Sequence, residues 1–344
     1  MSSVAPQDDL TMQPNPLETT LKKLAEDTGP VSVASLYTLS GLDPDDVQQV
    51  RSAWPMIPVD RRESAMRHLV EIAEENFEVD FNSIYRLGLT DQDPEVRSTA
   101  IDGLWEDNDP ALIELLIRFM QSDTAESVRA AAAGALGRYV LAGELEEIPA
   151  AKIEPVTAAL RATLLKTDES IEVRRRALEA LGFLGADEAA ELIDQSYKDP
   201  NERMRVSAVF AMGRSADAQW GEVVIGELNS ANPEMRFEAA RASGELEYAP
   251  ALPGLSNLID DVDDEVQKAA LWALGEIGGD TARRRLIKVL DSDAGYLHEV
   301  AEEALDELEF KTGNLDFSLL EVGEDDGDSW ALDLADEDDT ALDD

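Results

Sequence analysis

A repeated pattern constrains the fold of this chain more than any other feature of its sequence. Eight segments share one register, and the last four intervals between their starts are 31 residues each. The fifth residue of every segment is alanine. These alanines are Ala65, Ala100, Ala132, Ala177, Ala208, Ala239, Ala270 and Ala301. A pattern that returns so regularly predicts one structural unit used many times rather than several separate globular domains.

Each segment reads as an α-helix with one buried face. Its apolar and small residues stand at positions 0, 4, 7 and 8, which share one side of a helix. A second amphipathic stretch lies between successive segments, so the unit is a pair of helices that must stack on its neighbours to bury its apolar faces. We expect the segment helix to end in a left-handed cap where glycine recurs nine residues after the start. These glycines are Gly137, Gly182, Gly213, Gly244 and Gly275.

The unit resembles a known family. Residues 93–97, Asp-Pro-Glu-Val-Arg, followed by Ala100 and Leu104, resemble the second helix of a HEAT repeat. The 31-residue period and residues 273–278, Ala-Leu-Gly-Glu-Ile-Gly, resemble the short HEAT-like subtype named for phycobilisome lyases. The resemblance implies an all-α, right-handed α-solenoid of about eight two-helix repeats. It also implies a structural ladder, in which a recurrent arginine pairs with a residue of the preceding turn. The pairs would be Asp93 with Arg97, Asn201 with Arg205 and Asn232 with Arg236.

The pattern divides the chain into four parts. We expect a disordered N-terminus at 1–17, a helical N-terminal cap at 18–59, the repeat solenoid at 60–311 and a disordered acidic tail at 312–344. The tail contains 13 acidic residues and no basic one. Apolar residues spaced among acids suit docking into a groove with a basic rim. The tail residues predicted to contact a partner are Phe317, Leu320, Trp330 and Leu332. A tail that only solubilises the chain, or one whose residues 317–322 fold back over the last repeat, is the alternative.

The charge of the chain narrows the classes of partner. Its 344 residues carry a formal net charge of −45, which disfavours binding to a nucleic-acid backbone. The sequence has no cysteine and no long apolar run, so we expect a cytoplasmic protein that does not bind membranes. We expect the partner to be a protein or a peptide, and a basic partner is an open alternative.

The residue types argue against a metal site. One HEAT-like family, the deoxyhypusine hydroxylases, binds iron through a set of His-Glu dipeptides, whereas this chain has two histidines and the one dipeptide His298-Glu299. We therefore predict no enzyme activity, catalytic residue, metal or cofactor. A bilin lyase-like role in chromophore attachment stays open, because the sequence signature of those enzymes is mainly the repeat itself.

Helical geometry places a candidate binding surface on the second helices. Positions two and six of a segment lie opposite its buried face, and second helices line the concave side of HEAT-type superhelices. On this surface we predict partner-binding residues at Arg175, Phe210, Phe237, Arg241 and Trp272. The aromatic residues could instead pack sideways between helices. The predicted function is a non-catalytic protein-interaction scaffold or adaptor, and an acidic chaperone or decoy for basic proteins is the alternative.

Overall fold

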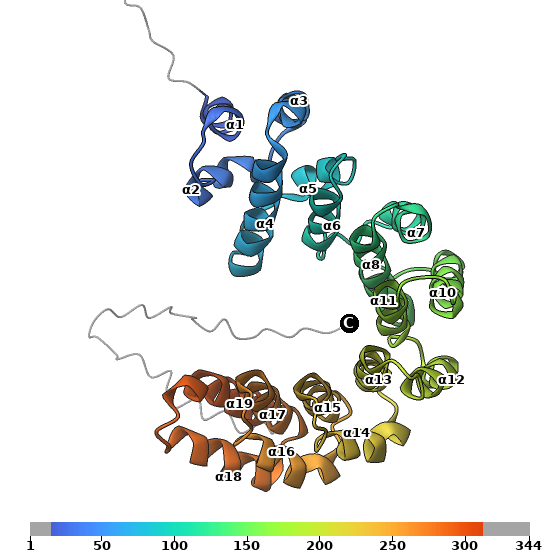
Figure 1. Cartoon of the computed structure of the whole chain (residues 1–344). Coiled ribbons are helices and arrows are strands. Elements are labelled where there is room, and N and C mark those ends of the chain that lie inside the picture. The colour runs from blue at the N-terminus through green and yellow to red at the C-terminus, as the bar shows by residue number, and fades with distance from the viewer. Residues whose placement is uncertain (1–14, 312–344) are drawn as a thin grey trace, which may run out of the picture.

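The computed structural model describes residues 15–311, apart from the side chains of residues 186–188. All regular structure in this range is helical, and the helices stack into a curved arc in which one layer of helices follows the inner side and another the outer side (Figure 1). The described part of the chain is therefore an all-α solenoid, as the repeat predicts.

Each of the eight predicted segments forms a helix of the inner layer. These helices are α4 (Val59–Glu75), α6 (Pro94–Gly103), α8 (Glu126–Ala135), α11 (Ile171–Leu181), α13 (Glu202–Arg214), α15 (Pro233–Glu245), α17 (Asp264–Ile277) and α19 (His298–Lys311). The outer layer contains α5 (Asn82–Gly88), α7 (Leu112–Ser122), α10 (Ala150–Leu165), α12 (Ala186–Tyr197), α14 (Gly221–Glu227), α16 (Leu252–Leu258) and α18 (Gly279–Leu290). Short 3-10 helices are η1 (Tyr37–Leu39), η2 (Trp54–Met56), η3 (Ala218–Trp220), η4 (Ala249–Ala251) and η5 (Gly295–Leu297).

Three helices precede α4: α1 (Pro16–Glu26), α2 (Val33–Leu36) and α3 (Pro44–Ala53). The first of them begins inside the segment 1–17 that we expected to be disordered. Asn15 caps it by accepting a hydrogen bond from the Leu17 amide, and proline suits the first turn. The buried Arg61 joins α1 to α4, because its guanidinium donates to the carbonyl oxygen of Leu24 at 2.7 Å.

The longest repeat contains the extra helix α9 (Gly137–Glu144). Tyr139 and Val140 of this helix are fully buried, and the Tyr139 hydroxyl donates to the carbonyl oxygen of Asp109 at 3.1 Å. The additional residues thus enlarge the core as well as lengthening a connection.

The recurrent alanines form the predicted contact between helices. All eight have 0% of their surface exposed. They belong to the hydrophobic core, where close packing leaves little room for a larger side chain. The register read from the sequence is therefore confirmed.

The prediction for the recurrent glycines was wrong. None of the five has a positive φ, and Gly213, Gly244 and Gly275 lie inside helices. A methyl group at Gly244 would lie 3.0 Å from Cα of Ala273 on the next inner helix, and the other four glycines face a neighbouring helix in the same way. Glycine is needed here for close approach. The left-handed residue comes three positions later in three repeats, at Ala216, Glu247 and Gly278.

The arginine ladder exists, but with different partners from those predicted. Arg97 makes two bonds to the Asp123 carboxylate, at 3.1 and 2.9 Å, and Arg236 makes two to Asp261, both 2.7 Å. Each acid belongs to the following repeat. The predicted partner Asp93 instead caps the N-terminus of α6, where its carboxylate accepts from two backbone amides. Asn201 and Asn232 cap α13 and α15, and the side-chain oxygen of each accepts from one backbone amide.

The ladder continues where arginine is replaced. Six side chains in this position donate to the carbonyl oxygen six residues earlier, and they belong to Arg97, Arg129, Arg205, Arg236, Gln267 and His298. Gln267 and His298 therefore keep the structural part of the contact at the C-terminal end of the arc.

Candidate functional site

A cavity of about 590 Å³ lies where α6, α8 and α11 meet. Its wall on α8 consists of small residues, Ala130, Ala131, Gly134 and Ala135. Ala130 and Gly134 occupy positions two and six of their segment, where every later repeat has larger side chains, such as Arg175, Phe210 and Trp272. The hollow exists because this one inner helix presents almost no side-chain volume.

The α6 side of the cavity provides an acid and an aromatic ring. Asp102 and Trp105 both line it, and 43% of the Trp105 surface is exposed. The Asp102 carboxylate is open to the cavity, but the surrounding protein displaces enough water to raise its pKa to about 6. No hydrogen bond or ion pair within the described residues involves this carboxylate. Asp102 is thus an acid able to change its charge near neutral pH.

The opposite walls are formed by two arginines. The Arg138 guanidinium lies 4.8 Å from the centre of the Tyr139 ring, and its buried Nε has no hydrogen-bond partner among the described residues. Arg176 lies between two acids, with Nε 3.2 Å from Glu172 and Nη1 2.9 Å from Glu179. These acids neutralise much of the Arg176 charge, so Arg176 offsets the negative charge of Asp102 only in part.

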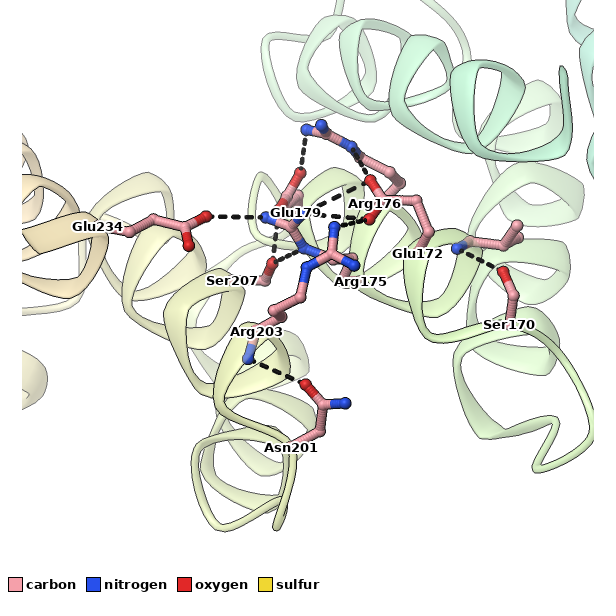
Figure 2. A network of polar contacts seen from close by, with 10 residues as sticks. Ser170, Glu172, Arg175, Arg176, Glu179, Asn201, Arg203, Ser207 and Glu234 are labelled. Atoms are coloured by element: carbon pink, nitrogen blue, oxygen red, sulfur yellow. Dashed lines mark hydrogen bonds and ion pairs between the residues drawn. The ribbon is translucent and has the colours of Figure 1, made fainter. Parts of the chain in front are cut away.

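A polar network continues from the cavity along the inner helices (Figure 2). Arg175 on α11 donates from Nε to the Ser207 hydroxyl of α13 at 2.9 Å, and Ser207 donates to Glu179 at 2.6 Å. Arg175 also lies 3.6 Å from Glu234 of α15, and Arg203 of α13 binds Glu172. The network therefore holds three consecutive inner helices in register.

Arg175 does not lie where a partner-binding residue was predicted. Its side chain is buried, with 8% exposed, and its guanidinium is occupied by the network. Position two of α11 faces the neighbouring helix α13 rather than open solvent, because adjacent inner helices pack closely. Arg175 therefore belongs to the contact between α11 and α13.

The structure places the predicted aromatic residues at the inner surface but half-buried. Phe237 and Trp272 pack against the core, and the Arg241 guanidinium stacks 3.8 Å from the centre of the Trp272 ring. Arg214 similarly lies 5.1 Å from the centre of the Phe210 ring. Sideways packing and cation–π pairing thus account for much of their surface. Their contact with a partner stays a prediction. The four predicted tail residues, Phe317, Leu320, Trp330 and Leu332, lie outside the described residues.

A second acid with an altered pKa lies on α15. Burial raises the pKa of Glu238 to about 7, and the carboxylates of Glu179, Glu245 and Glu234 add to the shift while Arg241 opposes it. Burial also raises the pKa of Glu245. Sequence analysis missed Asp102 and Glu238. The rule for positions two and six does select Ser98 and Asp102 when it is applied to α6, but burial of Glu238 depends on the neighbouring helices.

The described residues offer no metal centre. They contain no group of three or more histidine, cysteine or acidic side chains placed to hold an ion. His68 pairs with Glu71 at 2.8 Å, and His298 binds the carbonyl oxygen of Ser292 at 3.0 Å. In this same part of the chain, every helix is too short or too polar to cross a membrane.

Comparison with known proteins identifies the repeats. The family model described as HEAT repeats matches residues 86–153, 157–220 and 221–306, which make up more than half of the chain. A deoxyhypusine hydroxylase of Cryptococcus neoformans var. neoformans serotype D is 29% identical over 126 residues, 35% of this chain and 35% of that protein. The deoxyhypusine hydroxylase of Drosophila melanogaster is 26% identical over 121 residues, 35% of this chain and 40% of that protein. The matched segment therefore spans about a third of the length of these curated relatives.

Solved structures of low identity also match this chain. The complex of CpcE and CpcF of phycocyanin lyase from Nostoc sp. PCC7120 is 17% identical, with a TM-score of 0.45, and the match covers 90% of this chain and 100% of that chain. Human deoxyhypusine hydroxylase in complex with glycerol is 20% identical, with a TM-score of 0.31, and the match covers 86% of this chain and 96% of that chain.

The curated relatives correct the predicted function. We expected a non-catalytic scaffold without enzyme activity, but both curated proteins are enzymes. The prediction went wrong because it equated the lack of one metal-binding pattern with the lack of catalysis. Carboxyl groups with altered pKa values can serve chemistry without such a pattern.

Proposed function

The chain belongs to the HEAT-repeat family, and on this basis we propose that its inner surface recognises a cationic side chain of a protein substrate. The cavity between α6, α8 and α11 would receive that side chain. One observation carries the proposal: Asp102, whose carboxylate makes no hydrogen bond or ion pair within the described residues, shares the cavity with the half-exposed ring of Trp105. A carboxylate beside an indole ring suits an ammonium or guanidinium group, because the first pairs with the charge and the second attracts it through its π face.

The charge of the whole surface supports a basic substrate. Acids extend from the cavity along the inner helices to α15, including Glu172, Glu179 and Glu234 (Figure 2), and the chain as a whole carries −45. A field of this sign raises the local concentration of a cationic segment and its rate of association. The arginines of the same surface are held in ion pairs and stacks within the chain, as for Arg176 and Arg241.

The enzyme names of the relatives favour a chemical step after the substrate binds. Asp102, with a pKa of about 6, can accept or release a proton near neutral pH, as a general acid or base must. The iron that the hydroxylase resemblance implies does not fit this chain. The described residues have no suitable ligand cluster, and His68 and His298 have separate partners. No step through iron is therefore proposed.

We also propose a cytoplasmic location. It rests on the absence of cysteine from the sequence, which suits a reducing compartment.

Binding of a labelled octalysine peptide, measured by fluorescence anisotropy at about 0.15 M salt, tests the proposal. Asp102→Asn is expected to weaken binding roughly tenfold, the effect of losing about 1.4 kcal/mol of charge pairing. Trp105→Ala is expected to weaken it as well. For the unchanged protein, affinity should fall as pH decreases through about 6, because Asp102 becomes neutral.

The control is Asp168→Asn, which removes the same charge from an exposed position outside the cavity. Equal losses in Asp102→Asn and Asp168→Asn would show attraction by overall charge alone and would overturn the proposal. Equal binding of a peptide with acetylated lysines would overturn it too, because acetylation removes the cation that Asp102 is proposed to recognise.

A further inference from the structure

The outer helix α18 has an exposed basic cluster formed by Arg284, Arg285 and Lys288. None of these three side chains forms an ion pair with another described residue. By contrast, residues 174–176 on α11 are three consecutive arginines, and each of them forms at least one ion pair. In a chain with a net charge of −45, three neighbouring cations without acidic partners are exceptional.

A small pocket of about 170 Å³ borders this cluster. Ile259, Val289 and Leu297 provide its apolar part, and Arg285 and Lys288 lie at its edge. Tyr296 also lines the pocket and is 57% exposed, and Ile287, the residue before Lys288 on α18, is 40% exposed. The pocket lining thus combines apolar side chains with two cations and the acid Asp260, and a segment that contains both apolar and acidic residues can use the apolar part and the cations.

The chain contains such a segment directly after α19. Residues 312–344 hold 13 acidic residues and no basic one, and their first part reads Leu-Asp-Phe-Ser-Leu-Leu-Glu from 315 to 321. The segment follows α19 directly. Arg283 of α18 binds Glu309 of α19 at 2.6 Å, so the last turn of α19 lies next to the first half of α18.

The chain after α19 is long enough to turn back directly to the basic cluster on α18. Arg283 and Lys288 are five residues apart on a helix, which is about 8 Å along its axis. Six extended residues after Lys311 span about 20 Å. Residues near Phe317 can therefore reach the cluster without a long loop. The inner surface is a poor alternative for the segment, because it is itself rich in carboxylates.

We infer that residues 315–321 of this chain dock on α18 of the same molecule. Phe317 and Leu320 occupy the pocket, and Asp316 and Glu321 pair with Arg284, Arg285 and Lys288. The occupant is thus part of the chain itself, not a separate protein.

The test uses paramagnetic relaxation in the full chain, which has no cysteine and so accepts one spin label cleanly. A nitroxide is attached at Ile287→Cys, and the amide signals of residues 315–321 are recorded by NMR. We expect at least a twofold loss of their intensity. The matched control carries the label at Glu114→Cys, an exposed position on α7. Equal intensities with the two labels would overturn the inference.

A second experiment repeats the spin-label measurement after the charges of the basic cluster or of the tail segment are changed. Combining Arg284→Glu, Arg285→Glu and Lys288→Glu should restore the signals, and so should Asp316→Asn with Glu321→Gln, which leaves α18 unchanged. Attenuation that survives both sets of changes contradicts the pairing. Attenuation seen only when spin-labelled chains are mixed with separate isotope-labelled chains would assign the contact to a second copy and overturn docking within one molecule.

Discussion

Two acidic residues of the inner surface have raised pKa values because the surrounding protein removes water from them. Asp102 and Glu238 lie on different helices, yet the pKa of each is raised to about 6 and about 7, mainly by loss of water. Glu238 has the additional repulsion of Glu179, Glu234 and Glu245. Both acids therefore hold protons at a pH where ordinary carboxyl groups are ionised.

The raised pKa of Glu238 predicts how stability depends on pH. The folded chain binds this proton below about pH 7, whereas the unfolded chain releases it above about 4.5. The free energy of unfolding should therefore fall as pH rises from about 5 to about 8. Glu238→Gln should remove part of this dependence and stabilise the chain at pH 8, by on the order of 1 to 3 kcal/mol. Chemical denaturation at several pH values measures it.

Glu114→Gln serves as the control, because Glu114 is exposed on the outer helix α7. It should leave the pH dependence unchanged. A Glu238→Gln protein with the same pH profile as the unchanged protein would show that Glu238 is ionised in the folded state throughout this range.

At the scale of the elements, the spacing of inner helices depends on pairs of small residues. Gly213 faces Ala242, Gly244 faces Ala273 and Gly275 faces Ala304. A methyl group added to any of these glycines would lie 2.8 to 3.0 Å from the Cα of the facing alanine. The helices α15 and α17 lie side by side in the inner layer (Figure 1). The arginine ladder supplements this packing at the turns.

Gly244→Ala should destabilise the chain although alanine is the better helix former. The new methyl group would lie 3.0 Å from Cα of Ala273 and 2.6 Å from the Trp272 ring, so the helices must separate. We expect a loss of about 1 to 3 kcal/mol, as in other overpacked contacts. Thermal or urea unfolding measures this loss.

Gly226→Ala is the matched comparison. Gly226 lies inside α14 and a methyl group there meets nothing within 4 Å. Helix propensity alone then applies, and the change should stabilise the chain by up to about 1 kcal/mol. If both substitutions stabilise to the same degree, close helix approach is not what requires glycine at 244.

At the scale of the whole molecule, a solenoid distributes its charge along an extended body. We propose that residues 18–59 cap the first repeat, that 60–311 form the solenoid and that 312–344 form a separate acidic part. Each repeat contacts mainly its neighbours. The packing within and between neighbouring repeats, rather than one central core, must therefore outweigh the repulsion among the acids.

Because the acids repel one another, the melting temperature should depend on the salt concentration. Raising sodium chloride from about 0.01 M to about 0.5 M shortens the screening length from about 30 Å to a few ångström and should raise the melting temperature. Buried pairs such as Arg236 with Asp261 are screened less, so they should lose little. Calorimetry at fixed pH measures the effect. A melting temperature that falls with added salt would mean that ion pairs outweigh repulsion.

The repeat, its register and the layer in which each segment lies can be derived from the amino-acid order alone. The alanines at the fifth position show why: every copy meets the same neighbour in the same way, so local periodicity carries the packing information. The predicted scaffold function could not be derived in this manner, and the enzyme relatives corrected it.

The cavity, the altered acids and the true partners in the ladder arise only in the folded molecule. Asp123 pairs with Arg97 of the preceding repeat, and Glu238 is desolvated by side chains of other helices. The small residues of α8 become a hollow only because α6 and α11 stand beside them. Such features depend on distances between helices far apart in the chain, and helical periodicity specifies which face of a helix is buried but not which side chains meet across it.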